Sequence, residues 1–251
     1  MIQQGKNYIY GKHAVREALI HVPKTVRHVY LVSGHDTEEY LALVRTHSIP
    51  YDHCDAKHLP QGADREVVHQ GVLALVTPEK ILRQYKEFIS TLTVTNRTAL
   101  VLLDELTDPQ NVGAVIRSAA AFGAAGVLIP ERRQAQITGT VVKVSAGMAF
   151  TVPLVQVGNV NVVLRDLKER GFWTYGLTEK GATLLPNERF TKPSVFVLGN
   201  ESRGIREKTA DLCDFKLSIP IDSRCESLNA AVSAGVVLYA WANQRDAVRA
   251  E

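Results

Sequence analysis

The stretch "ALVLLDELTDPQNVGAVIRSAAAFGAAGVLI", residues 99–129, decides the fold class. An apolar run, "ALVLLD", precedes a turn at Asp108-Pro109, a helical stretch over 112–122 and a second apolar run, "GVLI". The alternation continues with helical stretches near 137–146, 160–170 and 205–211 and with the β-rich runs "PLVQV", "FWTYGL", "SVFVLGN" and "FKLSIP". Strands that alternate with helices predict an α/β fold whose mostly parallel sheet is covered by helices on both faces.

The composition is that of an ordinary globular protein. The 251 residues are 45% hydrophobic and 22% charged, enough for one large core or two smaller ones. The net charge of +3 permits a polyanionic partner but does not require one. The N-terminus "MIQQGKNYIYGKH" has no apolar signal-peptide region, and Asn229 and Ser233 interrupt the most apolar helical stretch. We therefore expect a cytoplasmic protein without a membrane partner.

The cysteines and histidines give no sign of a metal site. Cys54, Cys213 and Cys225 lie far apart and form no CxxC pair, which suggests neither a disulfide framework nor a zinc site. All eight histidines fall within the first 69 residues, and they have no metal-ligand spacing on a common helix face. We expect no bound metal ion.

The clustering of histidines also indicates two domains. Residues 1–77 are predicted to form a small α/β domain, with helices over 12–20 and 37–47, strands over 27–32, 49–52 and 71–76, and a short helix near Ala56. Pro78 breaks this pattern, and a more polar linker covers 78–97. The second domain covers 98–251.

Three segments that follow strands of the second domain are candidates for a functional site. They are "TDPQNVGAVIR", "GNESRG" and "IPIDSRCESLN". In open parallel sheets, ligands bind beyond the carboxyl ends of the strands, where these segments begin. A dinucleotide-dependent oxidoreductase is disfavoured, because the chain has no GxGxxG and the turn "DELTDPQN" contains no glycine.

Arg117, in the first segment, has unusually small neighbours on its helix. The positions three and four residues away are Gly113, Ala114, Ala120 and Ala121. None of them can cover the aliphatic stem of Arg117, so a phosphate or a ribose edge could reach the guanidinium. Two interpretations stay open: a ligand-binding arginine, or a solvated surface charge on a helix that Asn111 caps.

The other two segments carry glycines and polar side chains. Gly199 and Gly204 bracket a turn that holds Glu201, and they permit a ligand to approach the backbone closely. Ser227 is either the N-cap of a C-terminal helix that begins near residue 227 or a functional residue. The amide of Asn229 offers a ligand both a donor and an acceptor.

Together, the three segments resemble the three motifs of the SpoU-type branch of the SPOUT class of RNA 2′-O-ribose methyltransferases. The motifs are Asn111-x-Gly113 with Arg117, then "LGNESRG", then "IP" followed by "SLN". Through "YGKHAVREAL" and "HQGVLALV", the first domain resembles the RNA-recognition domain of bacterial enzymes that methylate a guanosine in 23S rRNA. The resemblance implies a C-terminal SPOUT domain with a deep trefoil knot, S-adenosyl-L-methionine held in that knot, and a homodimer.

Residue by residue, the resemblance assigns both catalytic positions and cofactor contacts. The catalytic positions are Arg117, Asn111, Glu201, Ser227 and Asn229. Cofactor contacts are expected mainly from the main chain at Leu198, Gly199, Ile219 and Leu228. The chain departs from the family pattern at Ile221, Ser223 and Cys225, in the loop that is expected to border the cofactor.

The predicted function is methyl transfer from S-adenosyl-L-methionine to the ribose 2′-hydroxyl of a guanosine in 23S rRNA. A tRNA 2′-O-ribose methyltransferase and a non-catalytic RNA-binding protein are the alternatives. The second domain contains no histidine, so the usual general base is absent from it. Either Arg117 gives up its proton to act as the base, or it positions the phosphate and polarises the hydroxyl while the proton leaves by another route.

Overall fold

The chain folds into two compact units. A computed structural model describes residues 7–64, 68–179 and 183–247. One unit is formed by residues 1–82 together with 137–151, and the other by residues 83–136 together with 152–251. The second unit contains all the residues that the sequence assigns to the functional site.

The N-terminal unit is built on a four-stranded sheet with the order β1-β4-β2-β3. β2 and β3 are parallel, whereas the other two pairs are antiparallel. The strands are β1 (Tyr8–Tyr10), β2 (Val26–Val32), β3 (Tyr51–Cys54) and β4 (Val72–Val76). The helices are α1 (Lys12–His21), α2 (Glu38–Thr46) and α5 (Gly139–Val144), with short 3-10 helices η1 (Pro23–Thr25), η2 (Pro78–Ile81) and η3 (Met148–Phe150). Most of the elements predicted from sequence for this unit are confirmed.

Two predictions for the N-terminal unit need correction. The strand predicted over 49–52 begins later, at Tyr51. The short helix predicted near Ala56 is wrong, because the chain forms a turn there. The Asp55 carboxylate accepts a hydrogen bond from the backbone N–H of Lys57 (3.1 Å), and the Asp55 carbonyl accepts one from His58 (2.9 Å). An aspartate that bonds to its own following backbone in this way closes a turn instead of starting a helix.

The helix predicted near 137–146 forms as α5 and packs against β1, within the N-terminal unit. Its first residue, Gly139, lies so close to the backbone of Tyr8 that an added Cβ would overlap the Tyr8 carbonyl oxygen. Glycine is therefore required at this approach of helix to strand. Residues 137–151, which follow one strand of the C-terminal unit and precede the next in sequence, therefore belong to the N-terminal unit.

The C-terminal unit contains an eight-stranded sheet with the order β10-β12-β9-β11-β6-β7-β8-β5. The pairs from β10 to β8 are parallel. The strands are β5 (Leu82–Gln84), β6 (Ala99–Asp104), β7 (Gly126–Pro130), β8 (Leu154–Val157), β9 (Trp173–Leu177), β10 (Thr183–Leu184), β11 (Ser194–Gly199) and β12 (Phe215–Ser218). The predicted parallel sheet is confirmed, and β6, the strand formed by "ALVLLD", is one of its central strands.

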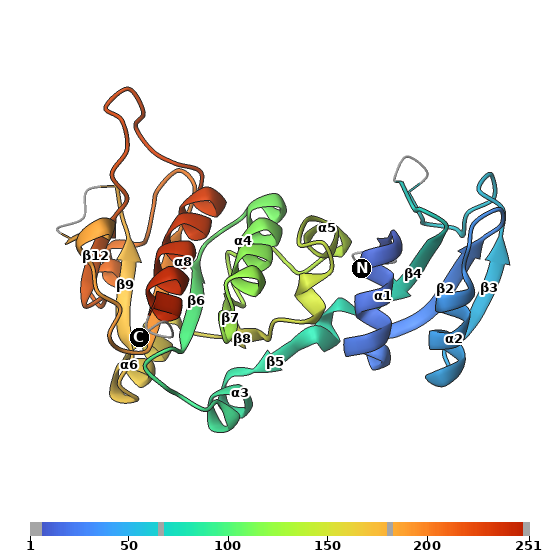
Figure 1. Cartoon of the computed structure of the whole chain (residues 1–251), viewed down its shortest axis with the longest axis horizontal. Coiled ribbons are helices and arrows are strands. Elements are labelled where there is room, and N and C mark those ends of the chain that lie inside the picture. The colour runs from blue at the N-terminus through green and yellow to red at the C-terminus, as the bar shows by residue number, and fades with distance from the viewer. Residues whose placement is uncertain (1–6, 65–67, 180–182, 248–251) are drawn as a thin grey trace. The chain divides into compact units, whose positions relative to one another are not determined.

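Helices cover both faces of this sheet (Figure 1). The helices are α3 (Tyr85–Thr91), α4 (Pro109–Ala121), α6 (Val160–Glu169), α7 (Glu207–Ala210) and α8 (Ala230–Ala247), with the 3-10 helix η4 (Leu185–Asn187). α3 and α6 share one buried cluster with Leu100 and Val195 of the central strands. α4 and α8 pack against each other, and Gly235 of α8 lies against Ser118 of α4. Two small residues, Ser118 and Gly235, therefore lie at the contact between the two helices.

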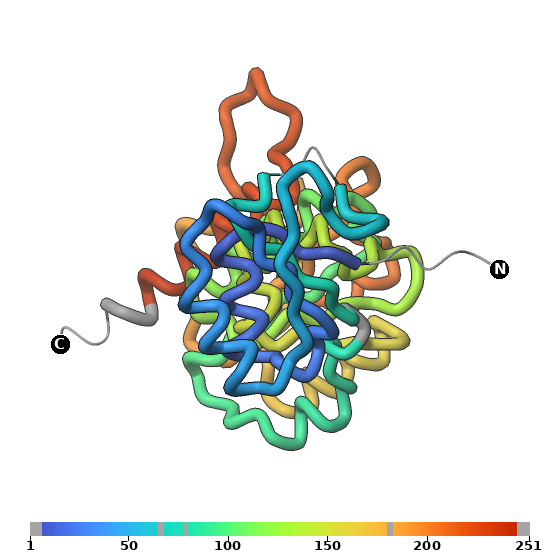
Figure 2. Tube along the Cα trace, turned by 90° about the vertical axis from the view of Figure 1, so that its right-hand side faces the viewer, coloured from blue at the N-terminus to red at the C-terminus, as the bar shows by residue number. Residues whose placement is uncertain are grey.

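The loop of residues 219–229, between β12 and α8, stands away from the sheet in both views (Figures 1 and 2). Every residue from 221 to 229 is exposed. The three departures from the family pattern, Ile221, Ser223 and Cys225, lie in this loop. They therefore change the surface of the loop and not the core of the fold. The trefoil knot that the resemblance implies for the C-terminal segment stays a prediction.

Candidate active site

A pocket of about 340 Å³ lies at the carboxyl edge of the sheet, beyond the ends of β9, β11 and β12. Ligands bind beyond the carboxyl ends of the strands in open α/β sheets, and the pocket lies at this edge. The predicted cofactor residues all line it; they are Leu198, Gly199, Ile219 and Leu228. Glu201 and Ser227 line it as well. The volume is within the range of small-molecule pockets.

Three predicted catalytic residues, one from each motif, form a continuous hydrogen-bonded chain. Asn111 Nδ2 donates to Glu201 Oε1 (3.0 Å), and Asn229 Nδ2 donates to Asn111 Oδ1 (2.8 Å). Asn111 is only 8% exposed, so its amide depends on these partners. The hydrogen bonds hold α4, the turn after β11 and the start of α8 in one arrangement.

Asn229, not Ser227, caps the C-terminal helix. α8 begins at Ala230, and Asn229 Oδ1 accepts hydrogen bonds from the backbone N–H groups of Ala231 (2.8 Å) and Val232 (3.3 Å). The prediction that Ser227 caps this helix is therefore wrong. Both residue types make good caps, and the amide of Asn229 can also donate to Asn111, which a serine at position 227 does not do. Ser227 is exposed and lines the pocket.

Asn111 does not cap α4 either. The helix begins at Pro109, and the Asp108 carboxylate accepts a hydrogen bond from the backbone N–H of Gln110 (2.8 Å). The interpretation of Asn111 as a helix cap is therefore wrong, because the cap lies three residues earlier. This leaves the Asn111 side chain free to join the three motifs.

Arg117 lies on the exposed side of α4. Val115 and Ala119 of the same helix are fully buried and form part of its core-facing side. Within the described part of the chain, the Arg117 guanidinium makes no hydrogen bond or ion pair, and Arg117 is not among the residues that line the pocket. Its five N–H donors are therefore available to a ligand.

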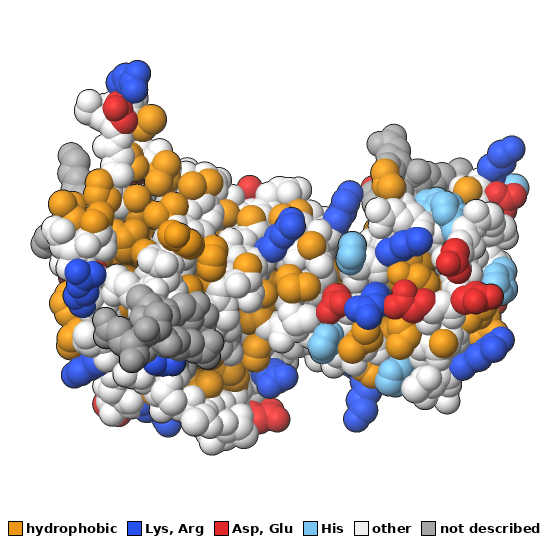
Figure 3. All heavy atoms as spheres, viewed as in Figure 1, with side chains coloured by type: hydrophobic (Ala, Val, Ile, Leu, Met, Phe, Trp, Pro, Cys, Tyr) orange, Lys and Arg blue, Asp and Glu red, His pale blue; other side chains and the backbone are white. Residues whose placement is uncertain are grey.

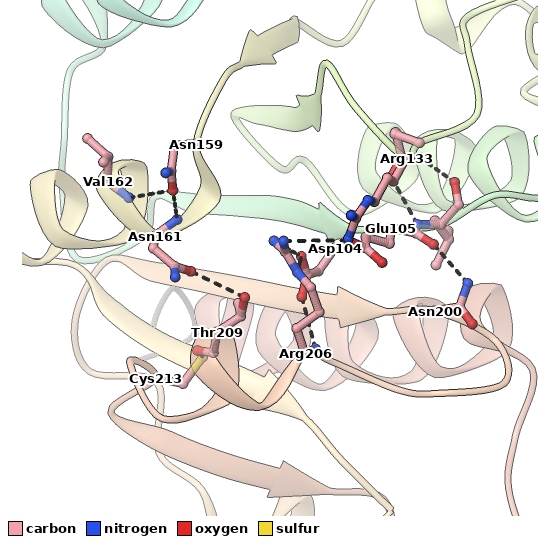
Figure 4. A network of polar contacts seen from close by, with 12 residues as sticks. Asp104, Glu105, Arg133, Asn159, Asn161, Val162, Asn200, Arg206, Thr209 and Cys213 are labelled. Carbon is pink, nitrogen blue, oxygen red and sulfur yellow. Dashed lines mark hydrogen bonds and ion pairs between the residues drawn. The ribbon is translucent and has the colours of Figure 1, made fainter.

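The turn of residues 200–205, which forms one wall of the pocket, is anchored by the contact of the next residue, Arg206, with Asp104 (Figure 4). Asp104 ends β6 and is fully buried. Its Oδ1 accepts hydrogen bonds from Arg206 Nε (2.8 Å) and Nη2 (2.5 Å), and its Oδ2 accepts one from the Arg206 backbone N–H (3.1 Å). The hydrogen bond to Asp104 raises the pKa of the Arg206 guanidinium, so Arg206 stays protonated.

Glu105 and Asn200 complete this support. Asn200 Nδ2 donates to the Glu105 carbonyl (2.9 Å), and the Glu105 carboxylate pairs with Arg133 (3.3 Å) and Arg206 (3.5 Å). Asn200 Nδ2 also lies 3.3 Å from Glu201 Oε2, so the Glu201 carboxylate is held at both oxygens. Asn200 thus connects the support under the turn to the chain of three motifs.

Gly199 is required by the turn itself. An added Cβ would overlap the backbone of Gly204 and Ile205, which folds back over Gly199. The backbones of Asn200 and Gly204 exchange two hydrogen bonds of 2.9 Å at this point. Sequence reasoning predicted close approach of a ligand here, whereas the closest approach is made by the chain's own turn. A side chain at position 199 would therefore disrupt the turn before it met any ligand.

Sequence reasoning missed Asp104, Asn200, Arg206 and Thr178 as parts of the site. Two of them carried a usable signal: Asp104 and Thr178 each come at the end of a predicted strand, on the edge where ligands bind. Asn200 and Arg206 gave no such signal, because their roles depend on hydrogen bonds to Glu105 and Asp104, about a hundred positions earlier in the chain.

No metal cluster is seen in the part of the chain that the structure describes, where no three His, Cys, Asp or Glu side chains are grouped as ligands. Among the helices of residues 7–64, 68–179 and 183–247, none is long and apolar enough to cross a membrane.

Comparison with known families identifies the class of protein. Residues 98–239 match the SpoU rRNA methylase family, and residues 8–82 match the substrate-binding domain of RNA 2′-O ribose methyltransferases. The chain belongs to the SpoU rRNA methylase family. The family match covers all three motifs and the whole of the pocket.

Individual relatives agree with this assignment. The chain is 36% identical to the 23S rRNA (guanosine-2′-O-)-methyltransferase RlmB of Pseudomonas putida, over 96% of this chain and 98% of that protein. It is 34% identical to RlmB of Escherichia coli K12, over 94% and 98% of the two chains. Among solved structures, it is similar to the SpoU methyltransferase AviRb from Streptomyces viridochromogenes in complex with AdoMet. The TM-score is 0.80 at 26% identity, and the match covers 97% of this chain and 92% of AviRb.

Proposed function

We propose that this protein transfers a methyl group from S-adenosyl-L-methionine to the ribose 2′-hydroxyl of a guanosine in 23S rRNA. The observation that carries the proposal is the hydrogen-bonded chain of Glu201, Asn111 and Asn229 beside a pocket at the carboxyl edge of the sheet. Both RlmB relatives, which cover nearly the whole chain, carry this activity in their names.

The residues of the pocket fit S-adenosyl-L-methionine. Apolar side chains of Leu198, Ile219 and Leu228 suit the adenosine, whereas the exposed Glu179 and Arg203 at the rim suit the charged amino-acid end. One buried oxygen in the pocket, Thr178 Oγ1, has no hydrogen-bond partner in the described part of the chain. When bound, this cofactor supplies a methyl group activated by a sulfonium.

Arg117 and Glu201 have different roles in the reaction: Arg117 binds the RNA, and Glu201 accepts the proton. The reaction forms a bond between the ribose oxygen and the methyl carbon, breaks the carbon–sulfur bond and releases the hydroxyl proton. The exposed guanidinium of Arg117 binds the adjacent phosphate through two N–H donors and orients the 2′-hydroxyl. The carboxylate of Glu201, held by two amides in the pocket wall, accepts the proton.

The N-terminal unit selects the RNA. The match of residues 8–82 to a substrate-binding domain supports this role, and we retain 1–77 as the RNA-recognition domain and 78–97 as its linker to 98–251. The RlmB relatives favour 23S rRNA over tRNA as the substrate. An enzyme with this substrate works in the cytoplasm.

A homodimer formed through α8 accompanies this function. Val232, Val236 and Tyr239 recur on one face of α8 and are 50%, 36% and 60% exposed. Figure 3 shows hydrophobic side chains gathered over α8. An apolar face of this kind in the free chain suits a second copy.

Sedimentation of a charged variant tests the dimer. Replacing both Val232 and Val236 by Asp should yield a monomer in analytical ultracentrifugation. The matched control is Val162→Asp on α6, since Val162 is 57% exposed and lies on another helix. A double variant that remains dimeric would remove α8 from the interface.

Ribose-methylation mapping in cells that lack the protein tests the proposed function. One 2′-O-methylguanosine should disappear from 23S rRNA and return with the wild-type chain, but not with Arg117→Ala. A missing methyl group in tRNA would instead support the alternative substrate. Unchanged methylation in both RNAs would support a non-catalytic RNA-binding role.

A further inference from the structure

The structure contains a buried hydroxyl that the fold leaves without a partner. Among the described residues, Thr178 Oγ1 is the single buried side-chain nitrogen or oxygen with no hydrogen bond. Buried polar groups in folded proteins are almost always paired, because an unpaired one loses its bonds to water and gains nothing in return. An unpaired buried hydroxyl inside a ligand pocket indicates that a bound ligand supplies its hydrogen-bond partner.

Thr178 lies on the inner wall of the pocket. It follows directly after β9, which is paired with β11 on one side and with β12 on the other. Its backbone N–H donates to the Leu217 carbonyl of β12 (3.0 Å), which fixes the main chain at this position. Thr178 therefore follows the strand that lies between β11 and β12, and Gly199, the last residue of β11, and Ile219, directly after β12, line the pocket with it.

The surroundings of Thr178 suit a neutral heterocycle. Its neighbours along the pocket wall include Leu177, Leu198 and Ile219, whereas the three charged lining residues, Glu179, Glu201 and Arg203, are all exposed. A charged carboxylate or ammonium beside Leu198 would lose its hydration without a counter-charge. The edge of a purine offers both donors and acceptors, and a threonine hydroxyl can pair with either.

We propose that Thr178 is an adenine-recognising residue, whose buried hydroxyl hydrogen bonds to the purine of S-adenosyl-L-methionine. This assignment rests on the proposed function and adds to it a residue that selects the base of the cofactor. Thr178 binds the cofactor without taking part in proton transfer or in RNA binding.

Two substitutions of Thr178 separate a ligand contact from a structural role. Thr178→Val keeps the shape and removes the hydroxyl, whereas Thr178→Ser keeps the hydroxyl. Isothermal titration should show S-adenosyl-L-methionine binding about tenfold more weakly to the valine variant and within about threefold of wild type to the serine variant. The melting temperature of the ligand-free valine variant should equal or exceed that of wild type, because the substitution removes an unpaired buried hydroxyl.

A second ligand locates the contact on the cofactor. 5′-Methylthioadenosine contains the adenosine and the sulfur but lacks the amino acid, so it should lose the same tenfold affinity for Thr178→Val. Loss of affinity for S-adenosyl-L-methionine alone would overturn the adenine assignment, because it would place the contact at the amino-acid end.

Thr174 provides a matched control on β9, the strand that Thr178 follows. Its hydroxyl donates to Asp214 Oδ2 (2.8 Å) and accepts from the Asp214 backbone N–H (2.9 Å), so it is fully paired. Thr174→Val should lower the melting temperature and leave cofactor affinity unchanged. Equal affinity of wild type and Thr178→Val, or a lower melting temperature of the free valine variant, would overturn the assignment of Thr178. Failure of the wild-type chain itself to bind S-adenosyl-L-methionine would overturn the proposed function, and this assignment with it.

Discussion

Helix α4 presents two polar residues, Asn111 and Arg117, in opposite environments. Asn111 is buried, and its amide is bonded to Glu201 and to Asn229. Arg117, less than two turns further along, is exposed and makes no polar contact in the described part of the chain. The first residue belongs to a framework that the fold completes by itself, whereas the second has donors that no side chain of the described chain occupies and that a ligand can reach. We infer that the cofactor side of the site is built in advance and that RNA completes the other side.

The largest effect should come from Arg117→Lys. Lysine keeps the charge but loses the planar pair of donors, so single-turnover methyl transfer should fall on the order of a hundredfold or more. The melting temperature and the affinity for S-adenosyl-L-methionine should not change, because Arg117 has no partner within the described chain. Arg165→Lys, at an exposed position on α6, is the control and should behave as wild type. Near-normal turnover of Arg117→Lys would mean that Arg117 supplies only a diffuse positive charge.

Among changes on the cofactor side of the site, Asp104→Asn should have the largest effect on stability. The buried carboxylate accepts three hydrogen bonds from Arg206, and loss of its charge should lower the free energy of unfolding by about 2 kcal/mol or more. Cofactor affinity should fall with it, since Arg206 anchors the turn that lines the pocket. Urea denaturation and titration measure the two effects. Asp222→Asn, in an exposed pair with Arg224, should leave stability unchanged, and equal losses in the two variants would argue against a special role for Asp104.

Asn229 should show a smaller effect, of about 1 kcal/mol for the loss of the helix cap in Asn229→Ala. Asn229→Asp retains the acceptor for Ala231 but cannot donate to Asn111. The aspartate variant should therefore keep more of the stability than alanine and still lose activity. If both variants retained full activity, the link between α8 and α4 would have no part in catalysis.

Ser227→Ala should have the smallest effect on stability, within a few tenths of a kcal/mol in urea denaturation, because Ser227 is exposed and does not cap α8. The same substitution tests its place in the pocket wall, where a modest loss of cofactor affinity is expected. A stability loss as large as that of Asn229→Ala would restore Ser227 as the cap.

The main elements could be predicted from sequence because the central strands β6, β7 and β11 are nearly continuous apolar runs that alternate with helical stretches. β1, β5 and β10 were missed, since strands of three, three and two residues are too short to establish a pattern. The sequence also could not show that α5 packs within the N-terminal unit, because that depends on the fit of Gly139 against Tyr8.

The site was predictable by resemblance and not by local pattern. The hydrogen bonds that join Asn111 to Glu201 and Asn229 span 90 and 118 positions, and no local periodicity reports such contacts. The same tertiary contact decides between Ser227 and Asn229 as the helix cap, because both residues have suitable side chains and only Asn229 also bonds to Asn111. Thr178 required the structure, since only the packing reveals that its hydroxyl is buried and unpaired.

Methyl transfer by the purified protein tests the central claim most directly. The wild-type chain, incubated with methyl-labelled S-adenosyl-L-methionine and unmodified 23S rRNA, should place the label in 2′-O-methylguanosine after digestion to nucleosides. Arg117→Lys should bind the cofactor equally well and transfer little label in one turnover. Label in a methylated base, or label in tRNA and not in 23S rRNA, would contradict the proposed reaction. Equal methyl transfer by wild type and Arg117→Lys would contradict the different roles assigned to Asn111 and Arg117.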